Sequence, residues 1–259
     1  MTEETSEAVR VWHEGHIAFV ELRRPPHNYF DAAVLNDIAV ELERLSTDDL
    51  SRAIVLCSEG KHFCAGANLT GSGKVDDIRG SSEVLYASAL RVLAQPLPMV
   101  AAVQGAAIGG GLGLALAADF RVAGPAARFA ANFSRLGFHP GFALSVTLPR
   151  LVGVQHATDL LLSGRTVNAD EAVAIGLCDR AADEGAERAI AAEVAAQLAA
   201  AAPLAVRSIR ATLRQGLVPQ FAAAIAHELD EQITLMGTAD WREGIRASRD
   251  RRSPAFTGH

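Results

Sequence analysis

The fold of this chain is decided by one glycine-rich stretch, Val103-Gln104-Gly105-Ala106-Ala107-Ile108-Gly109-Gly110-Gly111-Leu112-Gly113. Its first part continues an apolar strand predicted at 99–103, and its second part begins a helix predicted at 109–117. The three consecutive glycines leave backbone amides bare at the start of that helix, where about half a positive charge gathers. Glycine at a helix start costs stability unless something needs the bare amides, so the run predicts a backbone site for an oxygen.

A second backbone site is predicted in Lys61-His62-Phe63-Cys64-Ala65-Gly66-Ala67-Asn68-Leu69, which follows a buried strand predicted at 53–57. Its small residues at 65–67 let a ligand approach the main chain closely. Either stretch by itself is more often a packing or turn feature. The two together, in this order, are far more specific.

In this pair of stretches the chain resembles the crotonase superfamily, also called the enoyl-CoA hydratase/isomerase family. The likeness extends from the loop Arg24-Pro25-Pro26-His27-Asn28 to Arg251-Arg252-Ser253-Pro254-Ala255-Phe256. The resemblance implies a coenzyme A thioester as ligand, with no further cofactor. It also implies that the backbone N–H groups of Ala67 and Gly110 hold the thioester oxygen. Preorganised donors of this kind stabilise a developing enolate or oxyanion by about 3–4 kcal/mol each.

The resemblance further implies ligand contacts beside the two amides and near both ends of the chain. The residues expected to bind the ligand are Arg24, His27, Ala65, Gly66, Asn68, Leu69, Gly109, Phe133 and Arg251. Of these, Arg24, His27 and Arg251 would neutralise coenzyme A phosphates, although a solvated surface charge is the commoner role of a single arginine. Asn68 more often satisfies its own backbone in such a turn. We expect no metal site.

Three positions at which the family carries its acid and base carboxylates hold other residues here. The resemblance places hydratase glutamates at 113 and 133, where this chain has Gly113 and Phe133. It places the carboxylate of some isomerases and dehalogenases at 141, where this chain has Gly141. Such groups typically contribute about 10²–10⁴-fold each to the rate. The chain is therefore expected to be an atypical member that lacks the usual catalytic glutamates.

The leading candidate for proton transfer is His139, in the stretch Leu136-Gly137-Phe138-His139-Pro140-Gly141. This stretch belongs to the segment that supplies catalytic groups in the family. An unperturbed imidazole has a pKa of about 6.5, which suits proton transfer at neutral pH. The alternative is that His139 only caps or packs a turn. If Phe133 faces the pocket on a strand, alternation turns Asn132 and Ser134 away from it.

Composition narrows the partners and the compartment. The 259 residues carry a formal charge of -6, which argues against non-specific nucleic-acid binding. Cys57, Cys64 and Cys178 are odd in number and show no CxxC spacing, so we expect free thiols in a reducing compartment. The N-terminal residues lack an apolar signal core, and the longest apolar stretches are too short and glycine-rich to span a membrane. We therefore expect a cytoplasmic protein without membrane or nucleic-acid partners.

Hydrophobic periodicity predicts an α/β fold with an all-α end. Strands are predicted at 9–12, 16–22, 53–57, 99–103 and 120–123, and helices at 32–45, 81–94 and 109–117. After residue 144 we expect helices only, at 154–163, 169–175, 187–201, 203–214, 219–236 and 240–248. Asp31 is the expected N-cap of the helix at 32–45, and Asp119 is expected to be structural. With the resemblance, the pattern predicts a crotonase-type ββα spiral core at 1–200 and a helical oligomerisation region at 201–259, in a homotrimer or a dimer of trimers.

Two functions fit these expectations. The first is an enzyme that acts on an acyl-CoA or enoyl-CoA thioester by hydration, isomerisation, C–C cleavage or thioester hydrolysis, with His139 or an ordered water moving protons. The second is a non-catalytic acyl-CoA-binding protein that keeps the thioester grip and has lost the acid and base groups. The histidine between two glycines favours the enzyme. A structural subunit is a third alternative, disfavoured by the intact Gly109-Gly110-Gly111 run.

Overall fold

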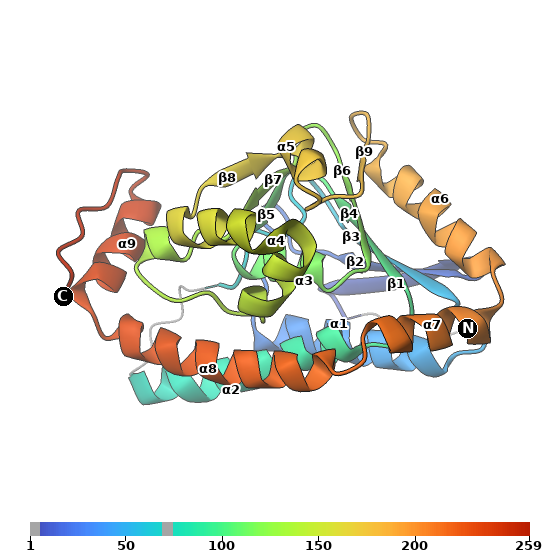
Figure 1. Cartoon of the computed structure of the whole chain (residues 1–259), viewed down its shortest axis with the longest axis horizontal. Helices are drawn as coiled ribbons and strands as arrows, with labels where there is room; N and C mark the ends of the chain where they lie inside the picture. Colours follow the sequence, from blue (N-terminus) through green and yellow to red (C-terminus); the bar gives the residue numbers. More distant parts are fainter. Residues whose placement is uncertain (1–5, 69–74) are drawn as a thin grey trace.

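The computed structural model describes residues 6–68 and 75–259. Its strands form two sheets, a larger one in the order β1-β2-β3-β4-β6-β9 and a smaller one in the order β5-β7-β8 (Figure 1). The larger sheet contains β1 (Val9–Glu14), β2 (Ile17–Leu22), β3 (Ala53–Ser58), β4 (Met99–Val103), β6 (Phe120–Ala123) and β9 (Arg180–Ala181). The smaller sheet contains β5 (Ala106–Ile108), β7 (Arg128–Ala130) and β8 (Thr166–Asn168).

From β4 to β7 successive strands alternate between the two sheets, which gives the chain a spiral path. β4 lies in the larger sheet and β5 in the smaller one, and β6 and β7 repeat this step. From β2 to β9 the strands of the larger sheet pair in parallel, while β1 and β2 form an antiparallel hairpin. Gly105 makes the turn from β4 to β5 with a φ of +59°, and a side chain there would overlap the Lys61 carbonyl oxygen. The predicted ββα spiral core is confirmed.

The helices follow the predicted apolar spacing. They are α1 (Ala32–Thr47), α2 (Val75–Ala94), α3 (Gly110–Leu116), α4 (Leu144–Ser163), α5 (Ala169–Ala174), α6 (Glu187–Ala200), α7 (Pro203–Leu213), α8 (Leu217–Met236) and α9 (Ala239–Arg249), with a 3₁₀ turn, η1, at Ser134–Leu136. In α1 the Asp31 carboxylate accepts the Val34 N–H at 3.0 Å, so the expected N-cap is present. The apolar stripe of α1, including Leu35, Ile38 and Leu42, is buried as predicted.

The larger sheet is buried on both faces, so its central strands need apolar residues at every position. On one face, side chains of α1 and α2 join those of the sheet in the main core. On the other face, α6 contributes Ala191, Val194 and Ala195, which cluster with Phe19 and Val100. Every residue of β3 is buried, which explains its continuous apolar run.

Several sequence-based expectations differ from the structure. The expectation of helices only after residue 144 is wrong, because β8 and β9 form there; strands of two or three residues are too short to show a period-two pattern. The segment 131–134 is no strand, since β7 ends at Ala130 and η1 begins at Ser134. Helix α2 begins before the predicted residue 81. The predicted helix 154–163 is the second half of α4, which is kinked at Gly153.

The C-terminal helices pack against the rest of the chain. Helix α8 runs alongside α2 (Figure 1), and the predicted division at residue 200 falls at the bend of 106° between α6 and α7. Among the described residues no single helix is long and apolar enough to cross a membrane, and α6 and α7 reach that length and composition only as a bent pair.

Asp119 anchors this helical end of the chain to the larger sheet. Its carboxylate accepts the Met99 N–H at 2.9 Å and the Arg210 Nε–H at 2.8 Å, and Arg214 approaches it at 3.5 Å. Arg210 is buried and also donates to the Gln95 carbonyl at 2.7 Å. Asp119 therefore has the structural role expected of it.

We expect Asp119→Ala to lower the free energy of unfolding by about 2–4 kcal/mol, because it leaves the buried Arg210 guanidinium without its counter-charge. Urea denaturation at neutral pH measures the change. Asp159→Ala is the control: Asp159 pairs with Arg165 at 2.7 Å on the surface, where such pairs contribute about 0–1 kcal/mol. Equal losses in the two variants would contradict the anchoring role.

Candidate active site

Backbone hydrogen bonds hold the two predicted backbone sites side by side. The Phe63 N–H donates to the Gln104 carbonyl at 2.8 Å, and the Cys64 N–H donates to the Ala106 carbonyl at 2.8 Å. In return, the Ile108 N–H donates to the Cys64 carbonyl at 3.0 Å. The segment after Cys64 therefore runs beside β5 and reaches the start of α3.

Ala67 and Gly110 line the same cavity. Phe30 bonds to the residues on either side of Ala67, donating to the Gly66 carbonyl at 3.1 Å and accepting from the Asn68 N–H at 2.9 Å. Since successive peptide groups of an extended segment point in opposite directions, the Ala67 N–H points away from Phe30. Gly110 begins α3, where the first amides have no intrahelical acceptor. Within residues 6–68 and 75–259, neither amide donates a hydrogen bond.

Gly66 permits the close approach of these two segments. Its φ is +107°, and a Cβ added to it would lie 2.9 Å from the Ile108 carbonyl oxygen and 3.7 Å from the Gly110 nitrogen. Glycine is the residue that tolerates both the conformation and the contact. The Gly66 position therefore joins the two predicted sites into one.

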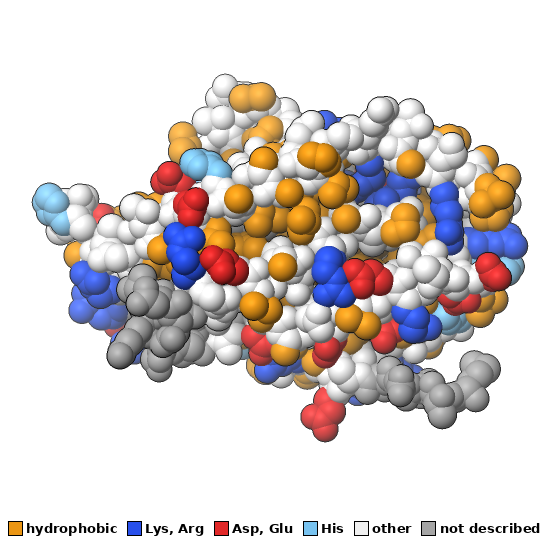
Figure 2. Space-filling model, turned by 90° about the horizontal axis from the view of Figure 1, so that it is seen from below, with side chains coloured by type: hydrophobic (Ala, Val, Ile, Leu, Met, Phe, Trp, Pro, Cys, Tyr) orange, Lys and Arg blue, Asp and Glu red, His pale blue; other side chains and the backbone are white. Residues whose placement is uncertain are grey.

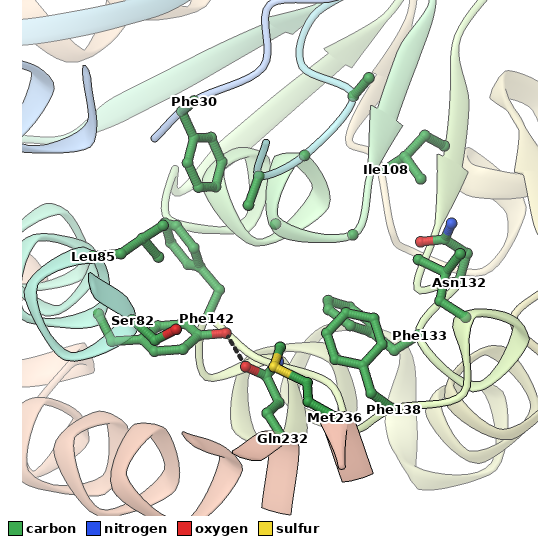
Figure 3. A pocket seen from close by; sticks show the side chains of 17 residues that line it. Phe30, Ser82, Leu85, Ile108, Asn132, Phe133, Phe138, Phe142, Gln232 and Met236 are labelled. Carbon is green, nitrogen blue, oxygen red and sulfur yellow. Dashed lines mark hydrogen bonds between the residues drawn. The ribbon is translucent and has the colours of Figure 1, made fainter. Parts of the chain in front are cut away.

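The cavity that Ala67 and Gly110 line has a volume of about 120 Å³. The cavity is lined by Phe30, Ala65, Gly66, Ala67, Ser82, Leu85, Tyr86, Ile108, Gly109, Gly110, Asn132, Phe133, Leu136, Phe138, Phe142, Gln232 and Met236. In Figure 3, Phe30 and Ile108 lie on one side and Gln232 and Met236 on the opposite side. The structure thus brings together Ala65, Gly66, Ala67, Gly109, Gly110 and Phe133 from the predicted ligand contacts.

Two of the three positions that lack a carboxylate have no room for any side chain. A Cβ added to Gly113 would lie 2.5 Å from the Cβ and 2.6 Å from the Cγ of Phe142. A Cβ added to Gly141 would overlap the hydroxyl oxygen of Tyr86 and lie 2.8 Å from Nε2 of Gln232. The aromatic rings and the amide of the cavity wall therefore occupy the space into which side chains at 113 and 141 would project.

A polar pair crosses the apolar wall of the cavity. The Tyr86 hydroxyl donates to Oε1 of Gln232 at 2.8 Å, and Nε2 of Gln232 donates to the His139 carbonyl at 2.9 Å. Burial raises the pKa of Tyr86, and the nearby Glu228 carboxylate raises it further. Tyr86 is the one titratable side chain among the described residues that line the cavity, and it is neutral at ordinary pH.

Glu228 lies behind this wall and fixes its backbone. It is fully buried on α8, where its carboxylate accepts the Ala143 N–H at 2.8 Å and the Ser145 N–H at 3.0 Å. These bonds hold Phe142 and Ala143, which both have left-handed backbone conformations, with φ of +62° and +54°. Burial raises the pKa of Glu228, and the hydrogen bonds from Ser145 and Ala143 oppose that rise.

The structure does not bring His139 to the cavity. Its ring lies beside His227, with a centroid distance of 5.8 Å, and its Nδ1 is 2.9 Å from the Pro140 carbonyl oxygen. Gln232, which lines the cavity, bonds to the backbone carbonyl of His139 and not to its ring. This placement agrees with the alternative role of packing a turn, and it differs from the expected direct proton transfer.

Asn132 and Phe133 both line the cavity, so the expectation that Asn132 turns away is wrong. The reason is that residues 131–134 form a turn and not a strand, so side chains do not alternate there. The Asn132 Oδ1 lies 3.4 Å from the position of a Cβ added to Gly109, next to the start of α3.

The other predicted ligand contacts lie outside the cavity. Arg24, His27 and Asn68 line one surface groove together, where Arg24 donates to the Asp31 carboxylate at 2.8 Å. Arg251, after α9, is exposed and lines neither the groove nor the cavity. Leu69 lies outside the described residues.

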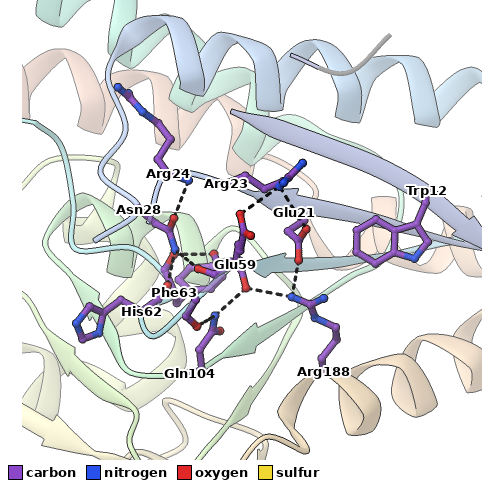
Figure 4. A network of polar contacts seen from close by, with 12 residues as sticks. Trp12, Glu21, Arg23, Arg24, Asn28, Glu59, His62, Phe63, Gln104 and Arg188 are labelled. Atoms are coloured by element: carbon purple, nitrogen blue, oxygen red, sulfur yellow. Dashed lines mark hydrogen bonds and ion pairs between the residues drawn. The ribbon is translucent and has the colours of Figure 1, made fainter. Parts of the chain in front are cut away.

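The buried side chain of Asn28 ties this groove to the amide-bearing loop (Figure 4). Its Oδ1 accepts the Arg24 N–H at 2.8 Å, and its Nδ2 donates to the carbonyls of Glu59 at 2.8 Å and His62 at 2.6 Å. His62 in turn accepts the Ala106 N–H through Nδ1 at 3.1 Å. Both residues therefore position backbone and lie outside the cavity lining.

Sequence analysis missed the side chains that close the cavity: Phe30, Ser82, Leu85, Tyr86, Ile108, Asn132 and, from α8, Gln232 and Met236. Those on α2 and α8 belong to helices whose apolar spacing is also that of core packing. Nothing in that spacing distinguishes a cavity wall from the core.

Comparison with known proteins decides the family. The model of the family described as enoyl-CoA hydratase/isomerase matches residues 13–259. The chain belongs to this family, the crotonases. A Mycobacterium tuberculosis protein described as a probable enoyl-CoA hydratase, EchA14, is 38% identical over 226 residues, or 85% of this chain and 86% of its own.

Two further crotonase-family relatives extend over nearly the whole chain. The 4-chlorobenzoyl coenzyme A dehalogenase-2 of an Arthrobacter species is 31% identical over 265 residues, covering 99% of this chain and 96% of its own. The crystal structure of an enoyl-CoA hydratase/isomerase from Pseudoalteromonas atlantica superimposes with a TM-score of 0.86 at 29% identity, covering 96% of this chain and all of that one. The family match includes both amide-bearing stretches and α8.

We expect Gly113→Ala to lower the free energy of unfolding by about 1–3 kcal/mol, because the added methyl group overpacks Phe142. Thermal and urea unfolding measure the loss. Gly80→Ala is the matched control: Gly80 lies in α2 with no atom within 4 Å of an added Cβ, so alanine should leave stability unchanged or raise it by up to about 1 kcal/mol. If Gly113→Ala is as stable as Gly80→Ala, position 113 has room for a side chain.

The raised pKa of Glu228 predicts a pH dependence of stability. The folded protein holds this proton more tightly than the unfolded chain, whose glutamate titrates near 4.5, so the contribution is full below that pH and is lost as the pH rises through the folded-state pKa. We expect wild type to lose free energy of unfolding relative to Glu228→Gln as the pH rises from about 4.5 towards neutrality. A pH-independent difference between the two proteins would contradict this expectation.

Proposed function

We propose that this crotonase-family protein acts on an acyl-CoA or enoyl-CoA thioester, with the backbone amides of Ala67 and Gly110 as the donors that hold the thioester oxygen. One observation carries the proposal: two residues whose amides lack a hydrogen-bond partner in the described part of the chain line the same cavity. Their donors come from the main chain and are held by neighbouring backbone bonds, so they need no reorganisation when charge develops.

The chemistry that such a pair supports is formation of an enolate or an oxyanion at the thioester carbonyl. As negative charge gathers on the oxygen, each amide contributes about 3–4 kcal/mol of stabilisation. The phenyl rings of Phe30, Phe133 and Phe142 contact the acyl group from the cavity walls. Coenzyme A phosphates lie along the groove with Arg24 and His27, where Arg24 exchanges its ion pair with Asp31 for the ligand.

The reaction is proposed as enolate chemistry other than efficient hydration. The relatives named above are described as a hydratase and a dehalogenase, so different reactions are attributed to this family. In this chain the spaces beside Gly113 and Gly141 are filled by Phe142, Tyr86 and Gln232. The carboxylates that the resemblance places at positions 113 and 141 are therefore absent, and no other acid or base side chain occupies those positions. These filled spaces also favour a second candidate, a non-catalytic acyl-CoA-binding protein.

A homotrimer or a dimer of trimers remains part of the proposal. Helix α7 leaves Leu204, Ile209 and Leu213 exposed by 80%, 60% and 73%. Hydrophobic side chains also gather in the middle of the face shown in Figure 2. Exposed apolar surface of this kind favours burial against further copies of the chain.

A comparison of the variants Gly110→Pro and Gly110→Ala tests the role of the Gly110 amide. Either substitution adds a Cβ, which would lie 2.7 Å from Cζ of Phe30, but only proline removes the N–H. We expect Gly110→Pro to turn over thioesters at least 100-fold more slowly than Gly110→Ala, the loss typical of one oxyanion donor. Turnover is read by mass on saturated, unsaturated and aromatic acyl-CoA thioesters in deuterated water.

The outcomes of this experiment separate the candidate functions. Water addition, deuterium uptake or release of free acid by wild type supports the enzyme and identifies its reaction class. Binding of thioesters without any mass change favours the acyl-CoA-binding protein, and Gly110→Pro should then weaken binding relative to Gly110→Ala. Equal behaviour of the two variants in both assays contradicts a role for the Gly110 amide.

A further inference from the structure

Gln232 lies on the side of the cavity opposite Phe30 and Ile108 (Figure 3), and it forms a polar pair with Tyr86, which also lines the cavity. Both side chains are buried, with exposures of 9% and 2%. They come from α2 and α8, two helices that pack against each other. A buried polar pair in a mostly apolar cavity wall costs stability unless its hydrogen-bonding capacity is used.

The direction of every hydrogen bond in this pair is fixed by a backbone carbonyl. The His139 carbonyl can only accept, so Gln232 presents Nε2 to it and Oε1 to Tyr86. The amide oxygen can also only accept, so the Tyr86 hydroxyl must donate to it. The hydroxyl has one hydrogen and has used it. What Tyr86 offers the cavity is an acceptor oxygen.

That acceptor is available in the described part of the chain. No described backbone group, and no side chain in 6–68 or 79–259, donates a hydrogen bond to the Tyr86 oxygen. Because position 141 is glycine, no side chain there covers this oxygen, which an added Cβ would overlap. The phenol also remains neutral, since burial and the Glu228 carboxylate both raise its pKa.

We propose that the Tyr86 oxygen, oriented by Gln232, recognises a hydroxyl group on the acyl chain of the thioester. The inference rests on the proposed function, because the acyl chain enters this cavity only if the Ala67 and Gly110 amides hold its thioester oxygen. A hydroxyl donates to the Tyr86 oxygen and completes the chain of hydrogen bonds. An alkyl group leaves the acceptor unpaired, and a ketone sets two acceptors against each other. Four-carbon acyl chains are small enough to test this recognition in a cavity of about 120 Å³.

Equilibrium binding of four thioesters tests the proposal: butyryl-CoA, 3-hydroxybutyryl-CoA, 4-hydroxybutyryl-CoA and acetoacetyl-CoA, by isothermal titration calorimetry. We expect at least one hydroxyacyl-CoA to bind wild type more than fivefold tighter than butyryl-CoA, with no such gain for acetoacetyl-CoA. Tyr86→Phe should reduce the hydroxyl gain below twofold and leave butyryl-CoA binding within threefold. Ser88→Ala is the control, because it removes another buried α2 hydroxyl that lies outside the cavity lining.

A second variant keeps the proposal testable if Tyr86→Phe does not fold. Gln232→Met releases the Tyr86 hydrogen, so the hydroxyl can donate into the cavity, and acetoacetyl-CoA should then gain affinity relative to butyryl-CoA. The proposal is overturned if neither hydroxyacyl-CoA binds wild type at least fivefold tighter than butyryl-CoA. It is equally overturned if acetoacetyl-CoA shows the same increase in affinity. It is also overturned if the gain survives Tyr86→Phe, which would assign recognition to Ser82 or Asn132. Failure of all four thioesters to bind would instead reject the proposed function.

Discussion

The structure of the site depends on the backbone ladder between the segment at Phe63 and Cys64 and the strand β5. This ladder joins two parts of the chain that otherwise belong to different turns of the spiral. It also explains the glycine run, because a side chain at Gly111 would overlap the Cys64 carbonyl oxygen that accepts from Ile108. The amides at Ala67 and Gly110 are therefore aligned by main-chain geometry, and side chains elsewhere in the cavity can differ without moving them.

The opposite wall of the cavity is built from side chains and is held under local strain. Phe142 and Ala143 both have positive φ, an uncommon conformation for residues other than glycine. The buried Glu228 carboxylate secures them through hydrogen bonds to backbone amides. In return, the ring of Phe142 fills the space beside Gly113. The strained backbone at Phe142 and Ala143, its hydrogen bonds to Glu228 and the shape of the cavity therefore all depend on α8.

The sequence predicts the features that depend on neighbouring residues. The Asp31 cap, the buried run of β3 and the small residues around Ala67 and Gly110 are local patterns with local physical causes. Tyr86 and Gln232 could not be found in this way, because they are 146 residues apart and meet only when α2 and α8 pack together. Asn132 was assigned to the wrong surroundings because residues 131–134 form a turn, for which strand alternation gives no orientation. His139 follows that turn and lies outside the cavity lining, so its role in proton transfer stays a prediction.

The contribution of α8 to the cavity also orders events during biosynthesis. In the direction of synthesis, the loops that carry the two amides precede Gln232 and Met236 by more than 120 residues. Because α8 also carries Glu228, the nascent chain lacks the carboxylate that binds the Ala143 and Ser145 amides, as well as the far wall of the cavity, until α8 is made. A chain translated only as far as α7 therefore lacks the side of the cavity that α8 supplies.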